Sequence, residues 1–171
     1  VASGQSAHAE GTYTVAGGHG SHAGGHGYFN KEVLSLGDGA FAHFTIEESE
    51  PLSVPVGAQG DFTAILGGRD KNIDSTATDS AIIGGQWNKI DNTVYGAILG
   101  GSFNYITGGT GSSHYNTIVG GFHNDISELT TGTYNIIAGG NTNFITETSV
   151  GCGIFGGVDN EINGDSEGTQ G

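Results

Sequence analysis

The hydrophobic residues of this chain fall into columns that recur from residue 65 to residue 162. Six glycine pairs set the register, with successive steps of 17, 16, 20, 19 and 17 residues. An isoleucine stands two residues before the first glycine of every pair, at Ile65, Ile82, Ile98, Ile118, Ile137 and Ile154. Another stands five residues after the second glycine, at Ile73, Ile90, Ile106, Ile126, Ile145 and Ile162. Fixed columns separated by gaps of variable length are typical of a parallel β-solenoid whose coils stack on one another.

The short strand predicted before each glycine pair is apolar on both faces. Successive residues of a strand point to opposite sides, so the isoleucine column occupies only one of them. The other side carries a second column, Leu66, Ile83, Leu99, Val119, Ala138 and Phe155. A single-chain solenoid buries only its inner face. The second column therefore predicts a symmetric partner, and the pattern alone permits a dimer as well as a trimer.

An asparagine recurs two residues before each late isoleucine, at Asn88, Asn104, Asn124, Asn143 and Asn160. In the first copy Lys71 takes this position. Stacked asparagines bond to one another or to the backbone at a turn. We expect a structural ladder at one corner of each coil.

The first forty residues repeat every seven positions instead. Glycines are seven apart from Gly4 to Gly25, as are alanines from Ala2 to Ala23. Glycine and alanine would leave a coiled-coil seam almost empty, so we expect short strands and 14-residue coils. The predicted organisation is a thin heptad roll over 1–39, a neck or crossover over 40–62 with both prolines, and a wider solenoid over 63–171.

Three heptad-region segments resemble a known group of repeats. Ala7-His8-Ala9-Glu10-Gly11, Ser21-His22-Ala23-Gly24-Gly25 and Ser35-Leu36-Gly37-Asp38-Gly39-Ala40 are similar to the head repeats of YadA-like trimeric autotransporter adhesins and of phage tail fibres and appendages. This resemblance covers residues 2–42, and the later repeats extend a looser likeness. It implies an intertwined homotrimer on a virion or an extracellular cell surface. Such repeats are specific for architecture and poor for function.

Composition narrows the function classes. The 34 glycines make helices improbable, and the formal charge is −14. That charge opposes binding to nucleic acid or to anionic lipid. No apolar run approaches the roughly 20 residues of a membrane span. We expect no nucleic-acid partner and no membrane insertion.

Exposed aromatic residues on a rigid β-surface are typical of carbohydrate binding, since a ring packs on the apolar face of a sugar. Two long insertions, 107–117 and 127–136, lie near several of them. The predicted glycan-binding residues are Trp87, Phe103, Tyr105, Tyr115, Phe122, Tyr134 and Phe144. The alternative is that these rings fill grooves between subunits.

Metal ligands are a second hypothesis. His8 and His22 are 14 residues apart and stack if a coil has 14 residues, while His19 and His26 both follow a repeat glycine. In a threefold assembly an axial histidine supplies three imidazoles. Calcium is the other candidate, from Asp159, Glu161, Asp165 and Glu167 or from Asp70 and Asp74. Otherwise we expect no cofactor.

The leading interpretation is a structural and receptor-binding segment of a trimeric viral or phage tail fibre or appendage that adheres to a host cell-surface carbohydrate. The alternatives are the head of a bacterial trimeric autotransporter adhesin and a trimeric β-helical polysaccharide-degrading enzyme. An enzyme needs paired carboxylates or a Tyr/Arg/His cluster, and Arg69 is the single arginine. We expect no catalytic residues and no enzymatic activity.

Overall fold

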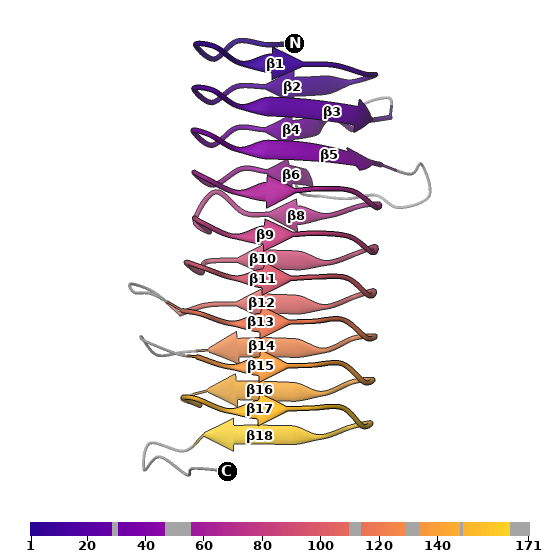
Figure 1. Ribbon diagram of the computed structural model, residues 1–171, viewed down its shortest axis with the longest axis vertical. Helices are drawn as coiled ribbons and strands as arrows, with labels where there is room; N and C mark the ends of the chain where they lie inside the picture. Colours follow the sequence, from indigo (N-terminus) through magenta and orange to yellow (C-terminus); the bar gives the residue numbers. More distant parts are fainter. Residues whose placement is uncertain (29–30, 47–55, 110–113, 129–133, 148, 165–171) are drawn as a thin grey trace.

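The computed structural model describes residues 1–28, 31–46, 56–109, 114–128, 134–147 and 149–164. Every regular element in these segments is a strand, and the strands stack as the coils of a parallel β-solenoid (Figure 1). The predicted all-β solenoid is confirmed. No helix in these segments is long and apolar enough to cross a membrane.

Each coil contributes one strand to each of two nine-stranded parallel sheets. The odd-strand sheet contains β1 (His8–Ala9), β3 (His22–His26), β5 (Phe41–Thr45), β7 (Ala64–Ile65), β9 (Ala81–Ile82), β11 (Ala97–Ile98), β13 (Thr117–Ile118), β15 (Ile136–Ile137) and β17 (Gly153–Ile154). The even-strand sheet contains β2 (Thr14–Ala16), β4 (Val33–Ser35), β6 (Val56–Ala58), β8 (Asn72–Ile73), β10 (Lys89–Asp91), β12 (Tyr105–Thr107), β14 (Asp125–Glu128), β16 (Phe144–Glu147) and β18 (Glu161–Gly164).

The isoleucine columns form the core of the C-terminal roll, the name we give to residues 56–164. Ile82, Ile98 and Ile118 pair in register in the odd-strand sheet and are fully buried. Ile90 and Ile106 do the same in the even-strand sheet. Full burial of one such side chain stabilises the fold by about 1.5–3 kcal/mol, so the repeated isoleucines define the inside of the coil.

The predicted asparagine ladder is present at the corner between each odd strand and the next even strand from β9 to β18. The Oδ1 atom of Asn88 accepts a hydrogen bond from the backbone N–H of Asn104 at 3.0 Å. Asn104 and Asn124 repeat this contact at 3.1 Å. Each Nδ2 also donates to the carbonyl four residues earlier, as Asn124 does to Gly120 at 3.0 Å. The buried amides therefore satisfy backbone groups at the turn.

Glycine is required at this corner because neighbouring coils approach closely. Gly101 has a φ of 77°. A Cβ atom at this position would lie 2.2 Å from the carbonyl oxygen of Gly121 in the next coil. No other residue fits both constraints.

The heptads form the N-terminal roll, the name we give to residues 1–46. His8 pairs with His22 and Ala2 bridges to Ala16, so the predicted 14-residue coil is confirmed for the first coil. The next coil is longer than predicted, since His22 pairs with Phe41 and Thr14 pairs with Val33, each 19 residues further on. Buried side chains in its first coils are small, for example Ala16, Ser21 and Ala23, whereas Val33, Phe44 and Ile46 fill the interior towards its C-terminal end.

The segment expected to be a neck continues both sheets. β5 pairs with β3 and with β7, while β6 pairs with β4 and with β8. Residues 47–55, with both prolines, lie outside the described residues. The proposed boundaries at 39 and 62 stay predictions.

Candidate functional site

The second apolar column lies on the outer face of the odd-strand sheet. Leu66, Ile83, Leu99 and Val119 are 41–53% exposed, whereas the isoleucine beside each of them is fully buried. A neighbouring outward column contains Ala64, Ala81 and Ala97, which pair in register. This combination makes a flat apolar strip along the C-terminal roll, which we call the aliphatic strip.

Tyrosines form a stacked row along the edge where each even strand leads to the next odd strand. The rings of Tyr95 and Tyr115 lie 4.7 Å apart at an interplanar angle of 10°, and those of Tyr115 and Tyr134 lie 5.0 Å apart at 1°. All three are exposed. Parts of both insertions, 110–113 and 129–133, lie outside the described residues. We call this row the tyrosine edge.

A second aromatic run lies at the corners on the opposite edge, where each odd strand leads to the next even strand (Figure 1). Trp87 stacks on Phe103 at 5.8 Å, and Phe103 meets Phe122 edge-on at 5.5 Å. His123 continues the run to Phe144 at 6.1 Å. Trp87, Phe103 and His123 have φ of 54–58°, because each occupies the left-handed position that turns the chain before the ladder asparagine.

The seven predicted glycan-binding residues therefore do not form one surface. Tyr115 and Tyr134 belong to the tyrosine edge, and Tyr105 lies on the even-strand sheet beside Lys89 and Asp125. Burial, and secondly the charge of Asp125, raises the pKa of Tyr105. The remaining four residues belong to the aromatic run on the opposite edge: Trp87, Phe103, Phe122 and Phe144.

Two members of these surfaces were missing from the predicted set. Tyr95 occupies the same column as Tyr115 and Tyr134, five residues before a glycine pair, and that position was sufficient to find it. His123 occupies the same repeat position as Trp87 and Phe103, one residue before a ladder asparagine, so its position was likewise sufficient to find it. Its ring contacts with Phe122 and Phe144 come from the structure.

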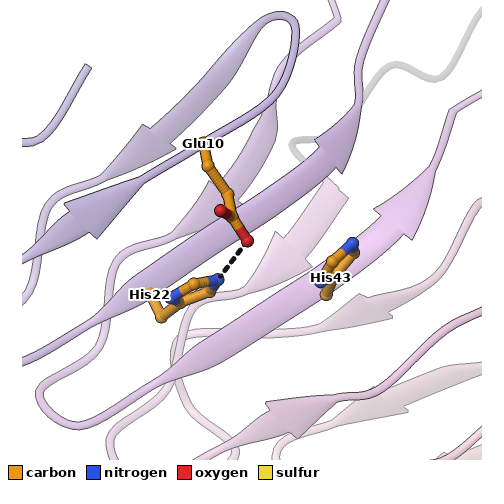
Figure 2. A group of neighbouring side chains, drawn as sticks. All are labelled: Glu10, His22 and His43. Atoms are coloured by element: carbon orange, nitrogen blue, oxygen red, sulfur yellow. Dashed lines mark ion pairs between the residues drawn. The ribbon is translucent and has the colours of Figure 1, made fainter.

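The four histidines predicted as metal ligands do not form one cluster either. His8 stacks on His22 with ring centroids 5.0 Å apart, as the 14-residue coil predicts. His19 is exposed in a turn, where its backbone N–H donates to Asp38 at 2.8 Å, and His26 is exposed at the end of β3. His22 instead lies beside Glu10 and His43 (Figure 2), two residues that were not among the predicted ligands.

The acidic residues predicted as possible calcium ligands are bonded to other groups or lie apart from one another. Asp74 accepts hydrogen bonds from the backbone and the hydroxyl of Thr76 at 3.0 and 2.9 Å. Despite partial burial, these bonds hold the pKa of Asp74 below its usual value. Asp70 is buried and lies 3.8 Å from Arg69. Asp159 and Glu161 are exposed, and Asp165 and Glu167 lie outside the described residues.

Lys71 is the charged exception in the asparagine ladder. Its side chain is fully buried, and the Nζ atom occupies the space above Gly68. Burial lowers the pKa of Lys71 from 10.5 to about 8, although the charge of Asp70 acts in the opposite direction. The first rung of the ladder thus carries a stability cost that the later rungs do not.

Comparison of the chain with family models, with curated proteins and with solved structures gives no match.

Proposed function

We propose that this chain is a structural and receptor-binding segment of a homotrimeric fibre or appendage that attaches to a cell-surface glycan. The aliphatic strip is the observation that carries the proposal. Exposed leucine, isoleucine and valine in four successive coils favour a subunit interface, because each side chain that becomes covered contributes about 1 kcal/mol.

The distribution of charge also favours the outer face of the odd-strand sheet as the subunit interface. From β7 to β17 the described outward positions of the odd-strand sheet are uncharged, from Ala64 and Leu66 onward. The outward positions of the even-strand sheet include Lys89, Asp91 and Asp125. One face is therefore suited to contact with another subunit and the other to solvent. Among symmetric assemblies, the resemblance to trimeric adhesin heads favours a threefold one.

Carbohydrate is the proposed external ligand because aromatic rings are exposed on both edges. Phe122 is 50% and Tyr134 is 60% exposed, and the tyrosine edge repeats a hydroxyl group in three successive coils. A trimer would present each edge three times, so weak contacts to a glycan add through multivalency. The charge of −14 per chain favours neutral or cationic sugars over acidic ones.

The oligomer test is light scattering on the purified chain. We expect three times the chain mass of 17.3 kDa for the wild type and a folded monomer for Leu99→Asp. Thr107→Asp, an exposed position on the even-strand sheet, is the matched control and should stay trimeric. A monomeric wild type, or a trimeric Leu99→Asp, would contradict the proposed interface.

The ligand test is a glycan array combined with whole-cell adsorption of the trimer. Trp87→Ala and Tyr115→Ala probe the two edges separately, and we expect at least one to lose adsorption. Unchanged adsorption by both would leave the segment as a spacer. Cleavage of a polysaccharide chain would favour the enzyme alternative.

A further inference from the structure

Three polar side chains from successive coils meet on the outer face of the odd-strand sheet (Figure 2). Glu10 directly follows β1, His22 begins β3 and His43 lies in β5. Ala9 pairs with Ala23 and Gly24 pairs with His43. The register therefore places Glu10 and His43 in one column on either side of Gly24, with His22 in the adjacent column.

Gly24 creates the space between them. A Cβ atom on Gly24 would lie 3.2 Å from Nδ1 of His43 and 3.3 Å from Nε2 of His22. The two imidazole nitrogens thus approach the same point above a residue that has no side chain. The third group is close, since Oε1 of Glu10 lies 3.4 Å from Nε2 of His22.

The spacing of these atoms fits a small transition-metal ion. One ligand atom from each of the three residues lies within 4.8 Å of the other two. Around tetrahedral zinc, with bonds of about 2.0–2.2 Å, ligand atoms are separated by about 3.3–3.5 Å. The Glu10–His22 distance already has this value. His43 and Glu10 are exposed, so their side chains are free to close the remaining gap around an ion.

His22 is held in place by its neighbours. Its ring is stacked between His8 at 5.0 Å and Phe41 at 4.8 Å, with interplanar angles of 15° and 12°. Its Nε2 atom is buried and makes no hydrogen bond within the described residues, but it faces Oε1 of Glu10 at 3.4 Å, the ion pair drawn in Figure 2. A buried nitrogen without a hydrogen bond is costly, and a metal ion placed between Glu10 and His22 would bond to both.

We propose that Glu10, His22 and His43 form a binding site for Zn²⁺ within a single chain. Two imidazoles and one carboxylate are a common ligand set for zinc, and three protein ligands leave an open position for water or an external donor. The site differs from an axial histidine site because it needs no threefold symmetry. It also does not depend on the proposed fibre function.

The test is calorimetric titration of Zn²⁺ into the tag-free chain in a buffer that does not chelate metal, with Co²⁺ absorption as a probe of tetrahedral geometry. We expect one ion per chain. His43→Ala and Glu10→Gln should each weaken binding at least tenfold, since even indirect partners of a ligand change affinity by about 10–100-fold. Circular dichroism verifies that each variant is folded.

The matched controls are His19→Ala and His26→Ala, which remove exposed histidines outside the cluster. Both should bind Zn²⁺ like the wild type. Gly24→Ala removes no ligand but fills the space between the imidazoles, so it should also weaken binding. Wild-type affinity in His43→Ala or Glu10→Gln, or an equal loss in the control variants, would overturn the proposed site.

Discussion

The N-terminal and C-terminal rolls belong to the same two sheets but have different interiors. The first coils of the N-terminal roll enclose alanine and serine, such as Ala16 and Ser21. A Cβ atom on Gly18 would lie 2.0 Å from the oxygen of Gly37, a close approach between coils that the C-terminal roll shares at Gly101. The C-terminal roll holds its sheets apart with isoleucine and closes one corner with asparagine. One topology can therefore be specified either by removing side chains or by filling the space with them.

The difference extends to the outer face of the odd-strand sheet. In the N-terminal roll this face carries His8, His22, Glu10 and His43, and from β7 onward the same columns carry alanine and aliphatic residues. The inner residues fix the register of each roll, which leaves the outer residues free to differ. Two kinds of surface can thus follow one another along a single sheet.

The largest effect is expected from a charge inside the C-terminal roll. Ile98 is fully buried between Ile82 and Ile118, so Ile98→Asp should unfold this roll, since an unpaired buried charge costs many kcal/mol. Leu99→Asp changes the next residue, which points outward, and should keep the coil folded. Circular dichroism during chemical denaturation measures both. Equal loss of structure in the two variants would show that inside and outside have been misassigned.

A smaller effect is expected from one methyl group in the N-terminal roll. Gly18→Ala forces two coils apart and should lower the free energy of unfolding by about 3 kcal/mol, the upper part of the range for overpacking. Gly100→Ala is the control, because nothing lies within 4 Å of a Cβ atom there. Its effect should stay within about 0.5 kcal/mol. Thermal denaturation of both variants measures how much the close approach of Gly18 to the next coil constrains this roll.

The asparagine ladder should contribute less per residue than the isoleucine column. Asn124→Ala removes Nδ2 bonds to Asn104 and Gly120 and the acceptor for the backbone N–H of Asn143. We expect a loss of about 2 kcal/mol, since an unsatisfied buried group costs about 1–3 kcal/mol. Asn141→Ala, an exposed position, should be nearly neutral in the same denaturation experiment.

The smallest effect concerns the first rung of the ladder and has the opposite sign. Lys71→Asn should raise the free energy of unfolding at pH 7 by about 1 kcal/mol, because it removes a buried ammonium and supplies an Oδ1 acceptor for the backbone N–H of Asn88. Between pH 8 and 10.5 the unfolded wild type retains a proton that folded Lys71 has released. Wild-type stability should therefore rise with pH across this window relative to the variant.

Lys89→Asn is the control for that experiment, since Lys89 is partly exposed and paired with Asp91 at 2.7 Å. It removes one lysine outside the ladder, so it measures the effect of a change in net charge alone. A Lys71→Asn profile that runs parallel to that of the wild type would show that Lys71 stays protonated throughout.

Much of the fold could be predicted because a solenoid repeats its constraints. The spacing of Ile82, Ile98 and Ile118 gave the inner column directly, and the alternation of strand residues placed Leu99 on the opposite side. The heptad predicted that His8 stacks on His22. In each case the pattern depends only on the period of the coil.

The candidate sites were less predictable because they depend on contacts between residues with irregular spacing. Glu10, His22 and His43 are separated by 12 and 21 residues in the sequence. The second interval exceeds the 14-residue repeat because the step from β3 to β5, from His22 to Phe41, is longer. Likewise, Trp87 and Tyr115 are near one another in the sequence but lie on opposite edges of the coil.

The stacking of coils also determines how the rod responds to force. Strands run across the long axis, and the hydrogen bonds between coils run along it (Figure 1). Tension applied to one end of the chain therefore loads the bonds of a single coil at a time. In the C-terminal roll a coil contains 16–20 residues, so each release lengthens the chain by roughly 55–70 Å at about 3.3–3.6 Å per extended residue. Such a rod peels coil by coil and dissipates the load in steps instead of rupturing at once.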